Sequence, residues 1–144
     1  MRLDRAPIGR TLAATSKAVS SAFNAVLRAE GGSLPVWLIL NSLKHDRWST
    51  QLDLARSLGI EGPTMTRHLD NLEESGFVTR RRSESDRRAV HVELTEAGSA
   101  AYDRMLVAVI AFNKRLQAGF ARDELRQLDD VLKRLADNVA APAS

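Results

Sequence analysis

Hydrophobic residues recur at helical spacing along most of the chain, and one short segment alternates instead. An apolar residue in every three or four positions marks the stretch from about Ile8 to Arg28 and returns in later segments. Residues at this period share one face, which is typical of an amphipathic helix packed on a core. Val90 to Leu94 alternates apolar and polar positions, which indicates a strand with one buried face. The predicted helices cover residues 8–28, 34–44, two short segments between 50 and 76, 95–119 and 122–139, with unstructured ends at 1–7 and 140–144.

The residues at the ends of these segments are of types that begin or end helices. Ser33, Thr50 and Thr95 each precede a predicted helix, and a hydroxyl there can accept a hydrogen bond from an unpaired N–H of the first turn. Gly59 can end the helix that follows Thr50, because glycine enters the left-handed conformation without steric cost. Gly98 lies in the first turn of the long helix after Thr95 and weakens it, so we expect close packing at that position.

The two short helices between residues 50 and 76 are joined by a tight turn. In the second of them, Met65, Leu69 and Leu72 are spaced i, i+4 and i+7, which predicts one buried stripe. The opposite face carries hydroxyl, amide and arginine side chains. These suit the major groove of DNA, where arginine binds guanine and short polar groups reach bases or phosphates. The candidate DNA-binding residues of this helix are Pro63, Thr64, Arg67 and Asn71, with Thr66 and His68 on its flanks.

A basic hairpin follows the second short helix. Between Phe77 and Val92, five arginines stand against two acidic residues, Glu84 and Asp86. Such a hairpin can neutralise phosphates or place an arginine in a narrow minor groove. We expect Arg87 and Arg88 at its tip to contact DNA, and Asp86 beside them to hold an arginine in place. The arginines before the tip leave a second interpretation open, a solvated strand edge that discourages aggregation; they are Arg80, Arg81 and Arg82.

Several short motifs occur together in this region, in a set order and spacing. They are Gly59-Ile60-Glu61, Pro63, Arg67, Leu69-Asp70, Gly76-Phe77-Val78, Asp86-Arg87-Arg88-Ala89 and Leu94-Thr95-Glu96-Ala97-Gly98. Together they resemble the MarR family of bacterial winged helix-turn-helix regulators, and within it the SlyA-like branch. The resemblance covers roughly residues 34–100 and implies a mostly α-helical fold with a small β-hairpin wing.

The resemblance also implies a domain organisation and a function. Residues 1–144 would form a single domain, with a winged helix-turn-helix DNA-binding part at 34–94 and helical dimerisation parts at 8–30 and 95–139. Such a protein is a dimeric, sequence-specific transcriptional regulator, more often a repressor than an activator. Its operator on double-stranded DNA is pseudo-palindromic, because a symmetric dimer presents two copies of the second short helix.

The resemblance also implies that the protein binds a small ligand. In members of this family a small anionic, aromatic or phenolic effector enters between the DNA-binding part and the dimer helices. Trp37 and the end of the first helix are the candidate wall residues of such a site. An ordinary core tryptophan is the alternative interpretation of Trp37, although a core tryptophan can also wall a pocket.

Composition adds limits to these expectations. The 144 residues, 44% of them hydrophobic, suffice for one compact domain with its own core. Because the net charge is only +3, the local arginines carry the argument for DNA. The chain has no cysteine, which excludes a disulfide, a thiolate metal site and a redox-sensing thiol, and we expect no metal or cofactor. No apolar run approaches the roughly 18 residues of a membrane span, so we expect a cytoplasmic protein.

Two other classes of protein are alternatives to a DNA-binding regulator. An enzyme is disfavoured because the three histidines, His45, His68 and His91, are spread along the chain and no glycine-rich phosphate loop is present. His45 beside Asp46 could form an acid/base pair, but adjacent loop residues are usually only solvated. The alternative function is a winged helix that binds protein rather than DNA. The hydroxyl-bearing second helix and the basic hairpin tip oppose it.

Overall fold

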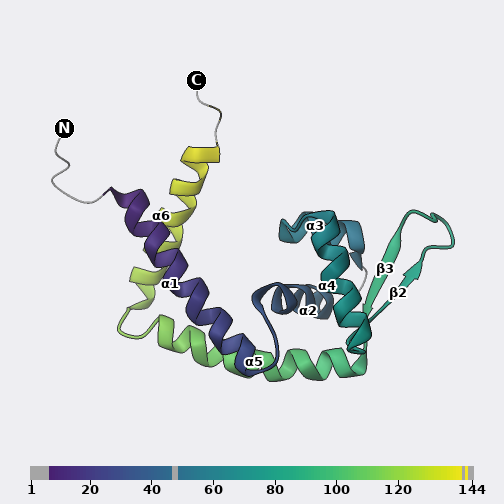
Figure 1. Ribbon diagram of the computed structural model, residues 1–144. Helices are drawn as coiled ribbons and strands as arrows, with labels where there is room; N and C mark the ends of the chain where they lie inside the picture. Colours follow the sequence, from purple (N-terminus) through teal and green to yellow (C-terminus); the bar gives the residue numbers. More distant parts are fainter. Residues whose placement is uncertain (1–6, 47–48, 141, 143–144) are drawn as a thin grey trace. The chain divides into compact units, whose positions relative to one another are not determined.

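The computed structural model describes residues 7–46, 49–140 and 142, so most of both predicted unstructured ends lies outside the described residues. Six helices and three short strands follow one another in these ranges, and the fold is mostly helical with a β-hairpin wing, as predicted (Figure 1). The chain divides into two compact units, of which the first ends at Ile110. The elements are α1 (Ile8–Ala29), α2 (Leu34–His45), β1 (Ser49–Thr50), α3 (Gln51–Leu58), α4 (Gly62–Glu74), β2 (Val78–Arg82), β3 (Val90–Leu94), α5 (Glu96–Leu116) and α6 (Arg122–Ala140).

The core of the first unit is built from buried side chains of α1 to α5 together with the inner face of the sheet. In α4 the side chains of Met65, Leu69 and Leu72 are 0%, 0% and 4% exposed, which confirms the stripe predicted from their spacing. Burying one such side chain contributes roughly 1.5–3 kcal/mol, so this stripe holds α4 firmly on the core. The other elements contribute Leu27, Trp37, Ile39, Leu40, Leu43, Leu54, Ala55, Val78, Val92, Ala101, Tyr102, Met105 and Val109.

The wing, which consists of β2, β3 and the turn between them, belongs to a three-stranded antiparallel sheet in the order β1-β3-β2. Val78 lies opposite Leu94, and Arg80 lies opposite Val92, so β2 is an edge strand. Val92 is buried, as the alternation predicted. The opposite face of β3 was expected to be exposed to solvent, but its residues His91 and Glu93 are half-buried. The strand β1 was not predicted, since two residues are too few to show a period.

Hydroxyl caps begin three of the helices where the sequence predicts them. Ser33 accepts the Val36 N–H at 3.4 Å, and Thr50 accepts the Asp53 N–H at 3.1 Å. Thr95 accepts the Gly98 N–H at 3.0 Å and donates its own proton to the Gly76 carbonyl at 2.6 Å. The Thr95 side chain therefore ties the start of α5 to the turn that follows α4.

In the second unit, α6 is amphipathic but leaves its apolar side open. No residue of α6 is buried, and large apolar side chains such as Leu128 (49% exposed) and Val139 (85% exposed) reach solvent. On its polar side Lys133 pairs with Asp129 at 2.6 Å, one helical turn away. An amphipathic helix is stable when its apolar stripe packs against another surface. The exposed face of α6 is therefore available to a partner. Among the described residues, no helix is both long and apolar enough to cross a membrane.

Gly98 is packed as closely as its place in the helix predicted. A Cβ at this position would overlap the Phe77 carbonyl oxygen and lie 2.8 Å from Cδ1 of Leu94. Because a backbone carbonyl cannot rotate away, we expect Gly98→Ala to lower the free energy of unfolding by about 1–3 kcal/mol. Urea denaturation at equal protein concentrations measures this loss.

Gly9→Ala is the matched control for that measurement. Gly9 also lies in the first turn of a helix, and a Cβ there meets nothing within 4 Å. Helix propensity alone favours alanine over glycine by up to about 1 kcal/mol, so this variant should not lose stability. If Gly98→Ala behaves like Gly9→Ala, the close contact with Phe77 does not constrain α5.

Candidate nucleic-acid interface

The outward face of α4 carries the candidate residues in an accessible arrangement. Pro63, Arg67 and Asn71 are exposed, while Thr64 and His68 are half-buried at the edges of this face. The Arg67 guanidinium has no ion pair or hydrogen bond to any residue that the structure describes. A free guanidinium on an exposed helix face can accept a base edge or a phosphate as its partner.

The turn before α4 fixes how this helix leaves the core. Gly59 ends α3 in the left-handed region (φ 64°), as the sequence predicts, and the Ile60 N–H then donates to the Ala55 carbonyl at 2.9 Å. Pro63 is within the first two positions of α4, where its missing N–H has no intrahelical partner to lose. The two helices are therefore joined by a short and well-defined connection, as a helix-turn-helix requires.

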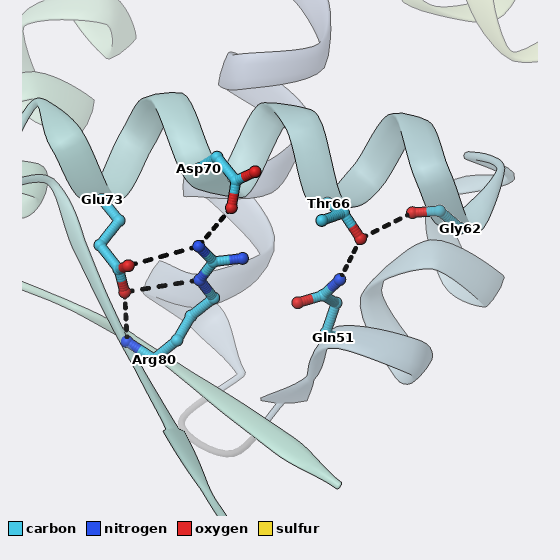
Figure 2. A network of polar contacts seen from close by, with 6 residues as sticks. All are labelled: Gln51, Gly62, Thr66, Asp70, Glu73 and Arg80. Atoms are coloured by element: carbon cyan, nitrogen blue, oxygen red, sulfur yellow. Dashed lines mark hydrogen bonds and ion pairs between the residues drawn. The ribbon is translucent and has the colours of Figure 1, made fainter. Parts of the chain in front are cut away.

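Thr66 is exposed, but its hydroxyl is already engaged within the protein. It donates to the Gly62 carbonyl at 3.1 Å and accepts a hydrogen bond from Nε2 of Gln51 at 2.7 Å, as Figure 2 shows. Gln51 is the first residue of α3 and was not among the predicted site residues. Its position after the Thr50 cap could have suggested that it lies near α4, but nothing in the apolar period marks it.

Arg80 joins the wing to α4 and is not a free cation. Its guanidinium pairs with Asp70 at 2.5 Å and with Glu73 at 3.3 Å, and its backbone N–H donates to Glu73 at 3.1 Å (Figure 2). Burial lowers the pKa of Arg80, but the hydrogen bonds and charges of Glu73 and Asp70 outweigh that effect and raise the pKa above its ordinary value. Asp70 and Glu73, two of the three acidic residues of α4, are thus engaged with the wing.

The other two arginines of β2 also have partners on the wing itself. Arg81 pairs with Glu93 on the adjacent strand at 3.3 Å. Arg82 donates from its guanidinium to the Arg87 carbonyl at 3.0 Å and braces the hairpin. The three arginines of β2 are therefore better interpreted as part of a structural strand edge than as a row of free DNA-binding cations.

Asp86 positions Arg88 through the main chain. Its carboxylate accepts the backbone N–H of Arg88 at 3.0 Å, and its own carbonyl accepts the Ala89 N–H at 3.0 Å. The bond goes to the N–H two residues on, as aspartate often does in turns. Arg87 and Arg88 are exposed, and neither guanidinium pairs with a carboxylate of the described residues.

Trp37, the candidate ligand-wall residue, is a core residue. It is 8% exposed, and its ring stacks on Tyr102 with centroids 5.1 Å apart and planes 3° from parallel. The Tyr102 hydroxyl donates to Asn41 at 3.1 Å and lies 3.2 Å from Nε2 of His45. One face of Trp37 is therefore covered by a side chain of the protein.

The acid/base pair considered from the sequence is not formed. His45 contacts Tyr102, whereas the Asp46 carboxylate accepts from the Ser42 hydroxyl at 3.4 Å. In the described part of the chain, no group of three or more histidine or acidic side chains is arranged to hold a metal ion.

Comparisons with known proteins agree with this geometry. The model of the MarR family matches residues 33–90. A cysteine-to-serine mutant of MarR from E. coli, solved in complex with operator DNA, is 25% identical with a TM-score of 0.81, over 90% of this chain and 93% of that one. The transcriptional repressor CouR bound to a 23-mer DNA duplex is 28% identical with a TM-score of 0.83, over 90% and 92%. A probable transcriptional regulator from Pseudomonas aeruginosa is 25% identical with a TM-score of 0.80, over 93% and 99%.

The contacts of Glu73 predict a measurable effect on the edge strand β2. Glu73→Ala removes the acceptor of the Arg80 N–H and one of the two partners of its guanidinium. We expect the Arg80 amide to exchange with deuterated solvent roughly tenfold faster, which corresponds to the loss of one modest hydrogen bond. Exchange detected by NMR measures this rate residue by residue.

Glu74→Ala is the matched control. Glu74 is the next residue of α4, is exposed, and has no ion pair or side-chain hydrogen bond to a described residue. Equal exchange rates at Arg80 in the two variants would mean that Glu73 does not hold the wing.

Proposed function

We propose that this chain is a DNA-binding transcriptional regulator of the MarR family and that it acts as a homodimeric repressor on a pseudo-palindromic operator. In this proposal α4 enters the major groove and the wing tip enters the adjacent minor groove. The base and phosphate contacts of α4 come from Thr64, Thr66, Arg67 and their neighbours Pro63, His68 and Asn71, and those of the wing from Arg87 and Arg88, positioned by Asp86.

The distribution of unpaired arginines is the observation that carries this proposal. Arg67 on α4 and Arg87 and Arg88 at the wing tip have no carboxylate partner among the described residues. The three arginines of β2 are engaged within the protein, since Arg80 and Arg81 pair with carboxylates and Arg82 donates to a backbone carbonyl. Unpaired guanidinium groups on the two elements that a duplex would touch supply the counterion release that drives DNA binding. A winged helix specialised for protein binding does not require this separation of paired and unpaired arginines.

A homodimer is supported by apolar surface on the terminal helices. In α1, Ile8 and Leu12 are 67% and 39% exposed, and α6 exposes an apolar face along its length. We assign dimerisation to residues 8–30 and 95–139 and DNA binding to residues 34–94. Two-fold symmetry would place two copies of α4 about one helical turn of DNA apart, which requires an operator with two similar half-sites.

Regulation by a small aromatic or phenolic effector belongs to the proposal through the resemblance to the SlyA-like branch. Such a ligand changes DNA binding only if it prefers one geometry of the dimer over another. Trp37 can take part by the edge of its ring, since Tyr102 covers one face. A regulator of this kind would work in the cytoplasm, where its operator is.

Arg67→Ala tests the reading of bases by α4. If Arg67 binds a guanine, we expect the variant to bind a duplex selected from a random pool about 1–3 kcal/mol more weakly and to lose preference at one base pair. Fluorescence anisotropy with single base-pair substitutions measures both effects. Arg104→Ala removes an exposed arginine of α5 as a control. Equal weakening of Arg67→Ala on every sequence would make Arg67 a phosphate contact.

Arg88→Ala tests the contact of the wing with DNA. Removing one phosphate contact should reduce the slope of log affinity against log salt by about 0.9. Arg81→Ala is the matched control, because its guanidinium already pairs with Glu93 and should release fewer counterions. Equal slopes for Arg88→Ala and the unsubstituted protein would exclude Arg88 from the interface. Failure of the unsubstituted protein to bind any duplex at low salt would contradict the proposed function.

A further inference from the structure

A hollow of about 510 Å³ lies between the starts of α3 and α4 and the base of the wing tip. Its walls come from both DNA-contacting elements, since Thr66 belongs to α4 and Arg88 belongs to the wing turn. In the proposed docking, α4 occupies a major groove and the wing an adjacent minor groove. A sugar-phosphate backbone separates any two adjacent grooves of a duplex. The space between α4 and the wing must therefore receive one DNA strand.

Gln51 lines this hollow and has hydrogen-bonding capacity left over. A threonine hydroxyl has one proton, and Thr66 gives its proton to the Gly62 carbonyl. Thr66 can therefore only accept from Gln51, so the Gln51 amide faces it with the NH₂ group (Figure 2). The second N–H of that group has no acceptor among the described residues. The orientation of the amide thus follows from the direction of the hydrogen-bond chain.

We propose that Gln51 is a positioning residue that donates its second amide N–H to a phosphate oxygen of the strand lying in this hollow. Through its first N–H it holds Thr66 at 2.7 Å, so one side chain links the DNA backbone to α4. This inference rests on the proposed mode of DNA binding. Its consequence is that Gln51 sets the depth and register of α4 in the major groove.

The geometry favours a phosphate over a base as the partner of Gln51. The residue comes from the first helix of the helix-turn-helix, which crosses the DNA backbone while the second helix enters the groove. Arg88 lines the same hollow and suits an anionic occupant, while the carboxylate of Asp86, which also lines it, accepts the Arg88 N–H. Backbone contacts of this kind orient a protein on the duplex without selecting its sequence.

Gln51→Ala should weaken binding of the dimeric protein about tenfold on every duplex tested, because a hydrogen bond to a charged group is lost. The salt slope should not change, since the amide is uncharged, in contrast to Arg88→Ala. Gln117→Ala is the matched control, because it makes the same substitution at a residue that is remote in sequence from the helix-turn-helix. Equal thermal unfolding of the variants shows that the fold is intact.

A second background separates the phosphate contact from an effect through Thr66. Thr66→Val keeps the shape of the side chain but removes the hydroxyl that Gln51 holds. If Gln51 contacts phosphate, Gln51→Ala still weakens binding about tenfold in this background. If it acts only by holding Thr66, the effect disappears and the inference is overturned.

Methylphosphonate substitutions in the duplex identify the phosphate. The unsubstituted protein should lose affinity when one particular phosphate is made neutral, and Gln51→Ala should be insensitive at that position. A Gln51→Ala effect confined to one base pair would overturn the inference in favour of base reading. Undiminished binding of Gln51→Ala to a duplex that the unsubstituted protein binds would overturn it while leaving the proposed function intact. Absence of any DNA binding by the unsubstituted protein would overturn both.

Discussion

The bridge from Arg80 to Asp70 and Glu73 links the wing directly to α4. Arg80 lies on the edge strand β2, and its two carboxylate partners lie on successive turns of α4. A protein that contacts adjacent grooves needs its two contacting elements at a set separation. The buried stripe of α4 holds that helix on the core, and the Arg80 bridge ties the wing to the helix together with the bond from the Phe77 N–H to the Leu72 carbonyl.

The same bridge decides which charges remain for DNA. Asp70 and Glu73 would repel phosphates if they stood free on α4, and Arg80 offsets one of their two negative charges on the side that faces the wing. Glu93 neutralises Arg81 in the same manner. The net charge of the chain is small, yet unpaired guanidinium groups are left at Arg67 and at the wing tip. The arrangement of pairs, more than the total charge, therefore makes the surface suitable for a duplex.

Local signals in the sequence predicted the parts of the fold that depend on neighbouring residues. The caps at Ser33, Thr50 and Thr95 and the helix limits needed only such signals, because capping and helical period act within a few positions. The remaining features join residues that are distant in sequence. Arg80 meets Asp70 across the turn after α4, and Gln51 meets Thr66 from another helix. No period or spacing indicates which of several similar polar side chains will meet across such a distance.

The turn after α4 is packed closely against the start of α5. The Thr95 hydroxyl donates to the Gly76 carbonyl, the Thr95 N–H donates to the Phe77 carbonyl at 3.0 Å, and Gly98 packs on that same carbonyl. The end of α4, the start of β2 and the start of α5 therefore share one backbone junction. A shift of any one of these three segments displaces the other two.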